Sequence, residues 1–188
     1  MARAGHLGDT ARARAGLVDS APIVRSTALG ALERLGSLGD DDLVNGLHDD
    51  DPTVRRRAAE LTATHLGAVL LPALDDPDSS VVEMAAWSAG ERQEVAAVDR
   101  LARMATGDTS HTDPLCREAA IAALGAIGDP RGLPAVLAAL DDKPAIRRRA
   151  AVALAAYEGP EVESALRRCL DDRDWQVRQV AEDLLAID

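Results

Sequence analysis

The segment DDDPTVRRRAAE, residues 49–60, recurs almost unchanged as DDKPAIRRRAAV, residues 141–152. Three explanations are open: a repeated structural unit, a duplicated active site, or a pair of basic patches for a nucleic acid. We define the anchor of each copy as the residue before its first arginine, or the equivalent position where the arginine is missing. With this definition, the repetition extends along the whole chain. The anchors are Val24, Val54, Val81, Cys116, Ile146 and Val177. Their successive differences are 30, 27, 35, 30 and 31 residues, which indicates six tandem units.

Fixed positions around each anchor predict where helices begin. Asp often stands three positions before the anchor and Pro two positions before it, which suits an N-cap and a first helical residue. Apolar residues then follow with a period of 3.6 residues. Four positions after the anchor the residue is always alanine: Ala28, Ala58, Ala85, Ala120, Ala150 and Ala181.

The copy DPLCREAAIAALGAIGD, residues 113–129, shows the pattern most completely. It ends in a Gly-Asp-Pro turn, and a second helix is expected from Arg131 to Leu140. Each unit is therefore predicted to be two antiparallel helices. No segment alternates strictly enough to predict a strand.

The pattern Asp…Pro-x-Val-Arg-x-x-Ala…Ala-Leu-Gly-x-Ile-Gly resembles HEAT repeats, and most closely the short HEAT-like repeats first noted in phycobilisome lyases. The resemblance covers residues 19–188. It implies an all-α fold, a right-handed α-solenoid (superhelix) of about six HEAT-like helical hairpins, whose second helices line a concave face. A single hairpin cannot cover its own apolar stripe, so neighbouring units must do so. The length predicts one domain, residues 1–188.

Composition restricts the possible partners. Net charge is −11, so a phosphate backbone is repelled overall and no nucleic acid is expected, whereas a basic protein or peptide is favoured. No run of 18 apolar residues is present, so no membrane span is expected. The first residues lack the apolar run of a signal peptide, which predicts a soluble, cytoplasmic protein.

An arginine directly follows the anchor in five of the six units, and an aspartate stands five positions before the anchor in five of them. The resemblance implies that these arginines pair with loop aspartates of their own or the adjoining unit. Such a ladder is structural, because functional groups do not normally repeat in every copy. The members are Asp19, Asp49, Asp76, Asp141, Asp172, Arg25, Arg55, Arg117, Arg147 and Arg178. The additional arginines Arg56, Arg57, Arg148 and Arg149 form either local basic patches or, as we expect, a solvated helix face compensated by nearby acids.

Departures from the repeat are the clearest indications of function. The third unit has Val82 in place of the arginine, and it also carries Met84 and Trp87. Trp87 stands six positions after its anchor, where other units place surface residues, and by family geometry it looks into the groove. Two interpretations stay open: Trp87 anchors an interface, or it fills the space left by the missing arginine. The candidate partner-binding residues are Trp87, Met84, Val82, Glu60, Val152, Arg56, Arg148 and His111. Trp175 is expected to pack over the final helix.

No catalytic residue, metal site or cofactor is predicted. Acidic clusters such as GDDD, residues 39–42, lack the alternating ligands and closing Glu of a calcium loop and read as helix caps. His6, His48, His65 and His111 have no partner in a shared motif. Cys116 and Cys169 read as small buried hydrophobic residues.

Three functions are considered. The favoured one is a non-catalytic scaffold or adaptor that binds a partner protein or peptide on the concave face of the solenoid. The alternatives are a bilin lyase-like factor that attaches a chromophore, and a HEAT-like DNA glycosylase or DNA-binding protein. The segment AEDLLAID, residues 181–188, also allows end-to-end self-association.

Overall fold

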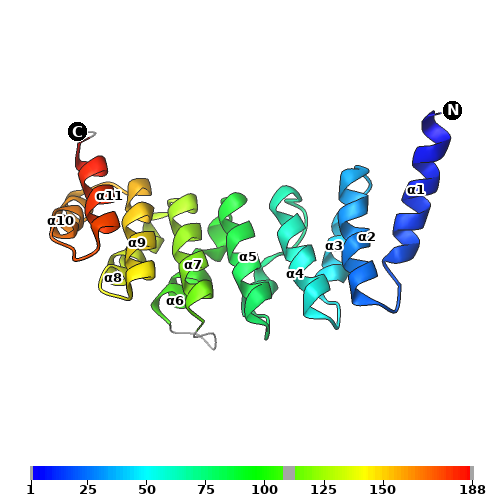
Figure 1. The fold of residues 1–188 in the computed structure, drawn as a ribbon, viewed down its shortest axis with the longest axis horizontal. Helices are drawn as coiled ribbons and strands as arrows, with labels where there is room; N and C mark the ends of the chain where they lie inside the picture. Colours follow the sequence, from blue (N-terminus) through cyan, green and yellow to red (C-terminus); the bar gives the residue numbers. More distant parts are fainter. Residues whose placement is uncertain (1, 108–112, 187–188) are drawn as a thin grey trace. The chain divides into compact units, whose positions relative to one another are not determined.

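The computed structural model describes residues 2–107 and 113–186, with side chains from residue 9 onward. These ranges contain helices and turns and no strand, so the predicted all-α fold class is confirmed (Figure 1). The α-helices are α1 (Ala2–Gly16), α2 (Pro22–Arg34), α3 (Asp40–Leu47), α4 (Pro52–Leu61), α5 (Ser79–Glu91), α6 (Val98–Thr106), α7 (Pro114–Ile127), α8 (Leu133–Ala139), α9 (Pro144–Ala153), α10 (Pro160–Cys169) and α11 (Trp175–Leu185). Five short 3₁₀ segments connect them: η1 (Thr62–Thr64), η2 (Leu71–Asp75), η3 (Val95–Ala97), η4 (Pro130–Gly132) and η5 (Leu154–Ala156).

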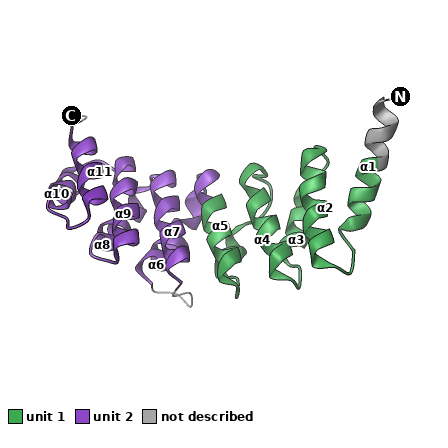
Figure 2. Cartoon of the chain, in the orientation of Figure 1, with its two compact units in different colours: residues 1–88 green, residues 89–188 purple. Residues whose placement is uncertain are grey.

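The chain divides into two compact units, residues 1–88 and 89–188 (Figure 2). In the first unit, α2 and α3 both pack against α4. In the second unit, α7 packs against both α6 and α9, and α9 also packs against α11. First helices of consecutive repeats are therefore neighbours within each unit.

Each first helix begins where the sequence predicts. Proline is the first helical residue of α2, α4, α7 and α9. The N-cap aspartates Asp51, Asp113 and Asp174 accept hydrogen bonds from the backbone N–H two residues later, at 2.8, 2.9 and 3.0 Å. These bonds satisfy donors that have no partner inside the helix. The alanine four positions after each anchor is buried in all six repeats.

The second repeat departs from the predicted pair of helices. Its second half consists of the 3₁₀ segments η1 and η2 instead of an α-helix. The physical reason is the short spacing of 27 residues between Val54 and Val81, combined with Gly67 and Pro72 in the connecting stretch. Gly lowers helix stability and Pro cannot donate within a helix interior, so a full second helix does not form here.

Small residues let the helices approach closely in a core that has almost no aromatic rings. A Cβ added to Gly125 on α7 would lie 2.8 Å from the Cβ of Ala153 on α9. The one tyrosine, Tyr157, is buried and its hydroxyl donates to the backbone oxygen of Leu124 at 2.9 Å. Cys116 and Cys169 are buried, as predicted. Among the described residues, no helix is both long enough and apolar enough to cross a membrane.

Candidate partner-binding surface

Arginine–aspartate pairs join consecutive repeats. Arg25 on α2 binds both carboxylate oxygens of Asp49, which precedes α4, at 2.7 and 2.6 Å. Arg55 on α4 holds Asp76 in the same bidentate way at 2.7 and 3.0 Å. Arg147 on α9 holds Asp172 at 2.9 and 3.0 Å. In each pair the arginine reaches the aspartate of the following repeat.

The same arginines also bind the loop that precedes their own helix. One guanidinium nitrogen of Arg55 donates to the backbone oxygens of Asp49 and Asp50, at 2.9 and 3.0 Å. Arg147 donates likewise to the backbone oxygen of Asp142 at 2.9 Å. Because one planar guanidinium engages two successive loops, it fixes the spacing and angle of adjacent repeats.

Four residues of the predicted ladder lack the arginine–carboxylate pair that the sequence pattern predicts for them: Arg117, Asp141, Arg178 and Asp19. Arg117 pairs with Asp142 and not with Asp141, which is exposed. In this loop the N-cap position holds Lys143, whose backbone N–H donates to Asp142 and holds its carboxylate in place. Arg178 donates to the backbone oxygen of Asp172 at 2.7 Å, and Asp19 accepts from the backbone N–H of Ala21 at 2.8 Å.

The ladder changes the acidity of its carboxyl groups. The hydrogen bonds from Arg25 hold the pKa of Asp49 below its ordinary value, against the opposing effect of burial. The hydrogen bonds from Arg147 likewise lower the pKa of Asp172. These two carboxylates therefore stay ionised, and their negative charges are paired with arginines of the same chain.

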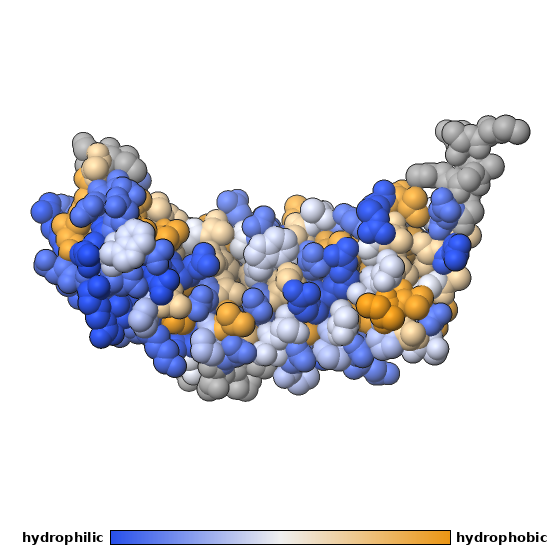
Figure 3. Space-filling model, viewed as in Figure 1, coloured by the Kyte–Doolittle hydropathy of each residue, from blue (hydrophilic) through white to orange (hydrophobic). Residues whose placement is uncertain are grey.

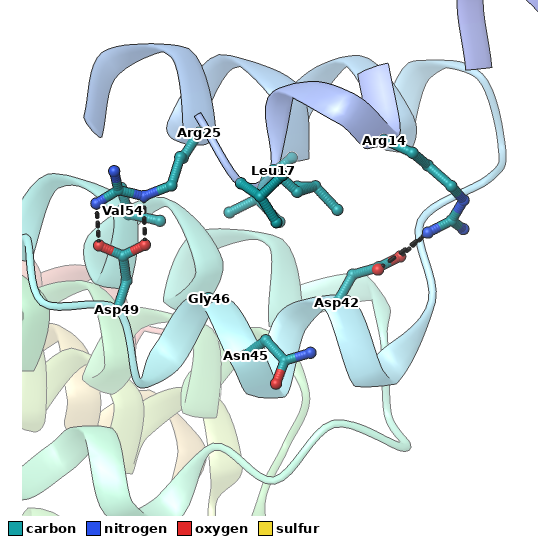
Figure 4. A pocket seen from close by; sticks show the side chains of 10 residues that line it. Arg14, Leu17, Arg25, Asp42, Asn45, Gly46, Asp49 and Val54 are labelled. Atoms are coloured by element: carbon teal, nitrogen blue, oxygen red, sulfur yellow. Dashed lines mark hydrogen bonds and ion pairs between the residues drawn. The ribbon is translucent and has the colours of Figure 1, made fainter. Parts of the chain in front are cut away.

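The first unit contains a cavity of about 460 Å³, and the two arginines that line it are both paired with aspartates (Figure 4). The Arg25–Asp49 pair closes one end of it, and the Arg14–Asp42 pair, 3.0 Å apart, closes the other. Leu17 points into the space between them. Both arginines already hold carboxylates, so this cavity offers no free cation to a ligand.

A group of residues on α2, α4 and α5 in the first unit includes the exposed Trp87, and we call it the Trp87 face. It consists of Gly30, Arg57, Glu60, Met84 and Trp87. Arg57 lies across α2 at Gly30, where an added Cβ would be 2.5 Å from its guanidinium, and it pairs with Glu60 at 2.7 Å. Trp87 is 43% exposed and Met84 is half-buried.

The other residues predicted to bind a partner are placed differently. Val82 is completely buried in α5, so its side chain is not on the surface. Arg148 is tied to Asp174 at 3.0 Å and to the side-chain oxygen of Gln176 at 2.9 Å. Arg56 is exposed and lies in the first unit. Arg148 and Val152 lie in the second unit, where Val152 is 51% exposed. His111 lies outside the described residues.

The expectation for Trp175 is wrong. Its side chain is 64% exposed at the start of α11 and does not pack over the final helix. Trp175 occupies the first helical position, where proline stands in other repeats, and side chains at this position point away from the following turns. The position of a residue within the repeat therefore decides its exposure more strongly than its hydrophobicity.

Sequence reasoning also missed a contact of His65. Its Nε2 lies 2.7 Å from a carboxylate oxygen of Glu33, and its Nδ1 lies 3.7 Å from Asp40. The two ring nitrogens face different carboxylates, so the arrangement joins the loop after α4 to α2 and α3. No group of three or more His, Cys, Asp or Glu side chains in the described part of the chain is placed to hold a metal ion. No signal for these contacts is present in the sequence, because they occur once and do not repeat at a fixed position in the other units.

Comparisons with known proteins agree with this geometry. The model of HEAT repeats matches residues 41–112 and 109–186. No curated protein sequence matches the chain.

The similar solved structures include the following three. A designed armadillo repeat protein in complex with the peptide (KR)4 has a TM-score of 0.71 at 17% identity, covering 93% of this chain and 97% of that one. A chain from the complex of CpcE and CpcF of phycocyanin lyase from Nostoc sp. PCC7120 has a TM-score of 0.66 at 25% identity, covering 94% and 75%. Human deoxyhypusine hydroxylase has a TM-score of 0.53 at 18% identity, covering 95% and 83%.

The matched residues cover most of the chain and include five of the six anchors. The chain belongs to the family of HEAT-repeat proteins.

Proposed function

We propose that the chain is a non-catalytic scaffold that binds an arginine-containing, basic protein segment on the Trp87 face. The observation that carries the proposal is the exposure of Trp87. The neighbouring Val82, Ala85 and Ala86 on α5 are completely buried, whereas 43% of the Trp87 side chain is exposed to solvent. A large aromatic ring held on a rigid helix is the usual anchor of a protein interface.

The charge of the chain supports a basic partner. Net charge is −11, and Glu83, on α5 four residues before Trp87, shares a helix face with it. An arginine of the partner can stack on the indole ring while its guanidinium approaches this carboxylate. Glu60 on the neighbouring helix is already held by Arg57, so we assign it a supporting role.

The test uses the peptide (KR)4 as the probe and Trp87 fluorescence as the signal. The chain has two tryptophans, so the Trp175→Ala background makes Trp87 the single fluorophore. Addition of the peptide is expected to change the emission saturably in this background. Replacing Trp87 with alanine in the wild-type chain should weaken binding, measured by calorimetry, by about 2 kcal/mol, or roughly thirtyfold.

The matched control is Trp175→Ala, which removes a more exposed tryptophan away from this face and should leave the affinity unchanged. Circular dichroism melting decides between the two roles left open for Trp87. If Trp87→Ala lowers the melting temperature by many degrees, Trp87 is a packing residue and the proposal is wrong. If the peptide binds both variants and the wild type equally, the Trp87 face is not the binding surface.

The likeness to the CpcE–CpcF complex favours a second candidate, a bilin lyase-like factor, because it covers 94% of this chain at 25% identity. This candidate predicts a change in visible absorbance when a free bilin is added to the purified chain. An unchanged spectrum at saturating bilin would remove it. The expectation that no nucleic acid binds is checked by a mobility shift with duplex DNA at low salt, where an electrostatic complex would be strongest.

A further inference from the structure

Four first helices, α2, α4, α7 and α9, share the same two positions on the side of the next repeat. One is the arginine after the anchor, and the other is an apolar residue four positions later. On α2 these are Arg25 and Leu29: Arg25 holds Asp49, and Leu29 packs in one apolar cluster with the anchor Val54. The equivalent pairs on the other helices are Arg55 with Ala59, Arg117 with Ile121, and Arg147 with Ala151, and all four apolar residues are buried. The donor half of the joint is therefore an arginine followed, four positions later, by a buried apolar residue.

The acceptor half of this joint is open at α2. Asp19 and Val24 occupy the positions that Asp49 and Val54 occupy in the next repeat. The Asp19 carboxylate accepts from the backbone N–H of Ala21, and Arg25 donates to the backbone oxygen of Asp19 and not to this carboxylate. Among the described residues, no arginine is paired with the Asp19 carboxylate as Arg25 is paired with that of Asp49. Val24 is 39% exposed, whereas the other five anchors are at most 2% exposed. We call this surface the Asp19–Val24 face.

A cavity lies on this face between α1 and α2. Its volume is about 340 Å³, and Ala13 and Gly16 of α1 and Val24 and Ala28 of α2 line it. The exposed side chains of Val18 and Ile23 extend the apolar surface beside it. Figure 3 shows apolar side chains gathered where α1 and α2 meet. Asp9 and Arg12 of α1 also line the cavity, and Asp19 stands in the loop between the two helices. A largely apolar surface with carboxylates beside it is complementary to a helix that carries an arginine and an apolar residue.

We propose that the Asp19–Val24 face docks a helix of a partner protein that presents an arginine and, four residues later, an aliphatic side chain. The arginine pairs with Asp19 as Arg25 pairs with Asp49, and the aliphatic side chain covers Val24 as Leu29 covers Val54. The docking follows the geometry that the chain uses between its own repeats. It is separate from the Trp87 face and does not depend on the function proposed for that face.

A second copy of this chain fits the face poorly. Its last first helix, α11, carries Arg178 at the arginine position, but the residue four positions later is Glu182, which is exposed. Docking of α11 would place the carboxylate of Glu182 against Val24. This carboxylate would lose its contact with water and gain no hydrogen-bond partner. The occupant is therefore a different helix, with an aliphatic residue where α11 has Glu182.

The test uses two peptides with the chain's own sequences as probes. The first copies residues 21–35, which contain Arg25 and Leu29, and the second copies residues 174–186, which contain Arg178 and Glu182. Each carries a side-chain cross-link to hold it helical, because isolated helices of this length are marginal in water. Fluorescence anisotropy with the full chain should show saturable binding of the first peptide and at least about tenfold weaker binding of the second.

Protein variants assign the binding to the face. Asp19→Asn and Val24→Glu should each weaken the first peptide at least about tenfold. Asp50→Asn, an exposed acid in the next loop, is the matched control and should bind like the wild type. Trp87→Ala should also bind this peptide normally, so failure here and failure of the function proposed above are distinguishable. Circular dichroism confirms that each variant is folded.

Three outcomes overturn the proposal. The first is that Asp19→Asn and Val24→Glu bind the first peptide as tightly as the wild type does. The second is that the copy of residues 174–186 binds equally well. The third is that sedimentation velocity shows the wild-type chain associating with itself through this face, with Asp19→Asn abolishing the association, which would make a second copy the occupant.

Discussion

Arg25 joins two loops at once, because it binds the carboxylate of Asp49 at 2.7 and 2.6 Å and the backbone oxygen of Asp19 at 2.9 Å. One side chain thereby ties the start of its own repeat to the start of the next. The bond is partly buried, with 16% of the Arg25 side chain and 14% of the Asp49 side chain exposed. Repetition of this joint explains why arginine and aspartate recur at fixed positions.

The first prediction concerns the ladder. Arg55→Ala leaves the Asp76 carboxylate, 7% exposed, without its counter-ion. We expect it to lower the free energy of unfolding by about 3 kcal/mol, as for other buried pairs that lose one member. The control Arg167→Ala breaks a pair whose side chains are 69% and 52% exposed, and should cost less than about 0.5 kcal/mol. Urea unfolding measures both, and equal effects would contradict a structural role for the ladder.

The second prediction concerns acid stability. The pKa of Asp172 is lowered in the folded chain, chiefly by the hydrogen bonds from Arg147. The folded state therefore binds this proton less readily than the unfolded state does. The resulting stability is present above the unfolded pKa of about 3.9 and is lost as pH falls through the folded value. Asp172→Asn should flatten the loss of stability below about pH 4, whereas the exposed neighbour Asp171→Asn should not.

The third prediction concerns alkaline stability and the one tyrosine. Burial raises the pKa of Tyr157 to about 12, with a smaller contribution from Asp129. The unfolded tyrosine ionises near 10, so the stability it provides is complete below about pH 10 and is lost as pH rises to about 12. Tyrosinate absorbance should therefore rise near pH 12 in the native chain and near pH 10 in denaturant. A native midpoint near 10 would show that Tyr157 is solvated, and Tyr157→Phe is the blank for the signal.

The fourth prediction concerns helix contact in the second unit. Gly→Ala in an exposed helix interior stabilises by roughly 0.5–1 kcal/mol. At Gly125 the opposite is expected, because the added Cβ would lie 2.9 Å from the Cα of Ala153. Gly125→Ala should destabilise the chain by about 1–3 kcal/mol, the cost of overpacking. A rise in melting temperature would show that α7 and α9 can separate without cost.

The sequence predicts the first helices well because their signals are local. Aspartate caps, a proline at the first position and a buried alanine one turn later act within a few residues. The alanine recurs in all six repeats, and the aspartate and the proline each recur in four. The arginine–aspartate joint is predictable for the same reason, since a column of paired charges repeats at a constant spacing. The family is predictable because several copies carry the same pattern.

The remaining features depend on contacts between distant segments. Asp142 replaces Asp141 at the joint because the loop before α9 has Lys143 at the cap. The missing α-helix in the second half of the second repeat is a different case, because the spacing of 27 residues, Gly67 and Pro72 are visible in the sequence, and the repeat pattern outweighed them in the prediction. The sequence placed Trp87 and Val82 together as candidate binding residues. Trp87 is exposed and Val82 is buried, because the two side chains lie on opposite sides of α5.

The regular joint also bears on how such a chain changes length during evolution. The anchors Cys116 and Ile146 stand 30 residues apart, and Ile146 and Val177 stand 31 apart. Loss of one such module by unequal recombination would bring Arg117 opposite Asp172, which already accepts an arginine from the preceding helix. A gain of one module would recreate the same partners on both sides. The coding sequence can therefore expand or contract in steps of about 30 residues without a new compensating mutation at the seam.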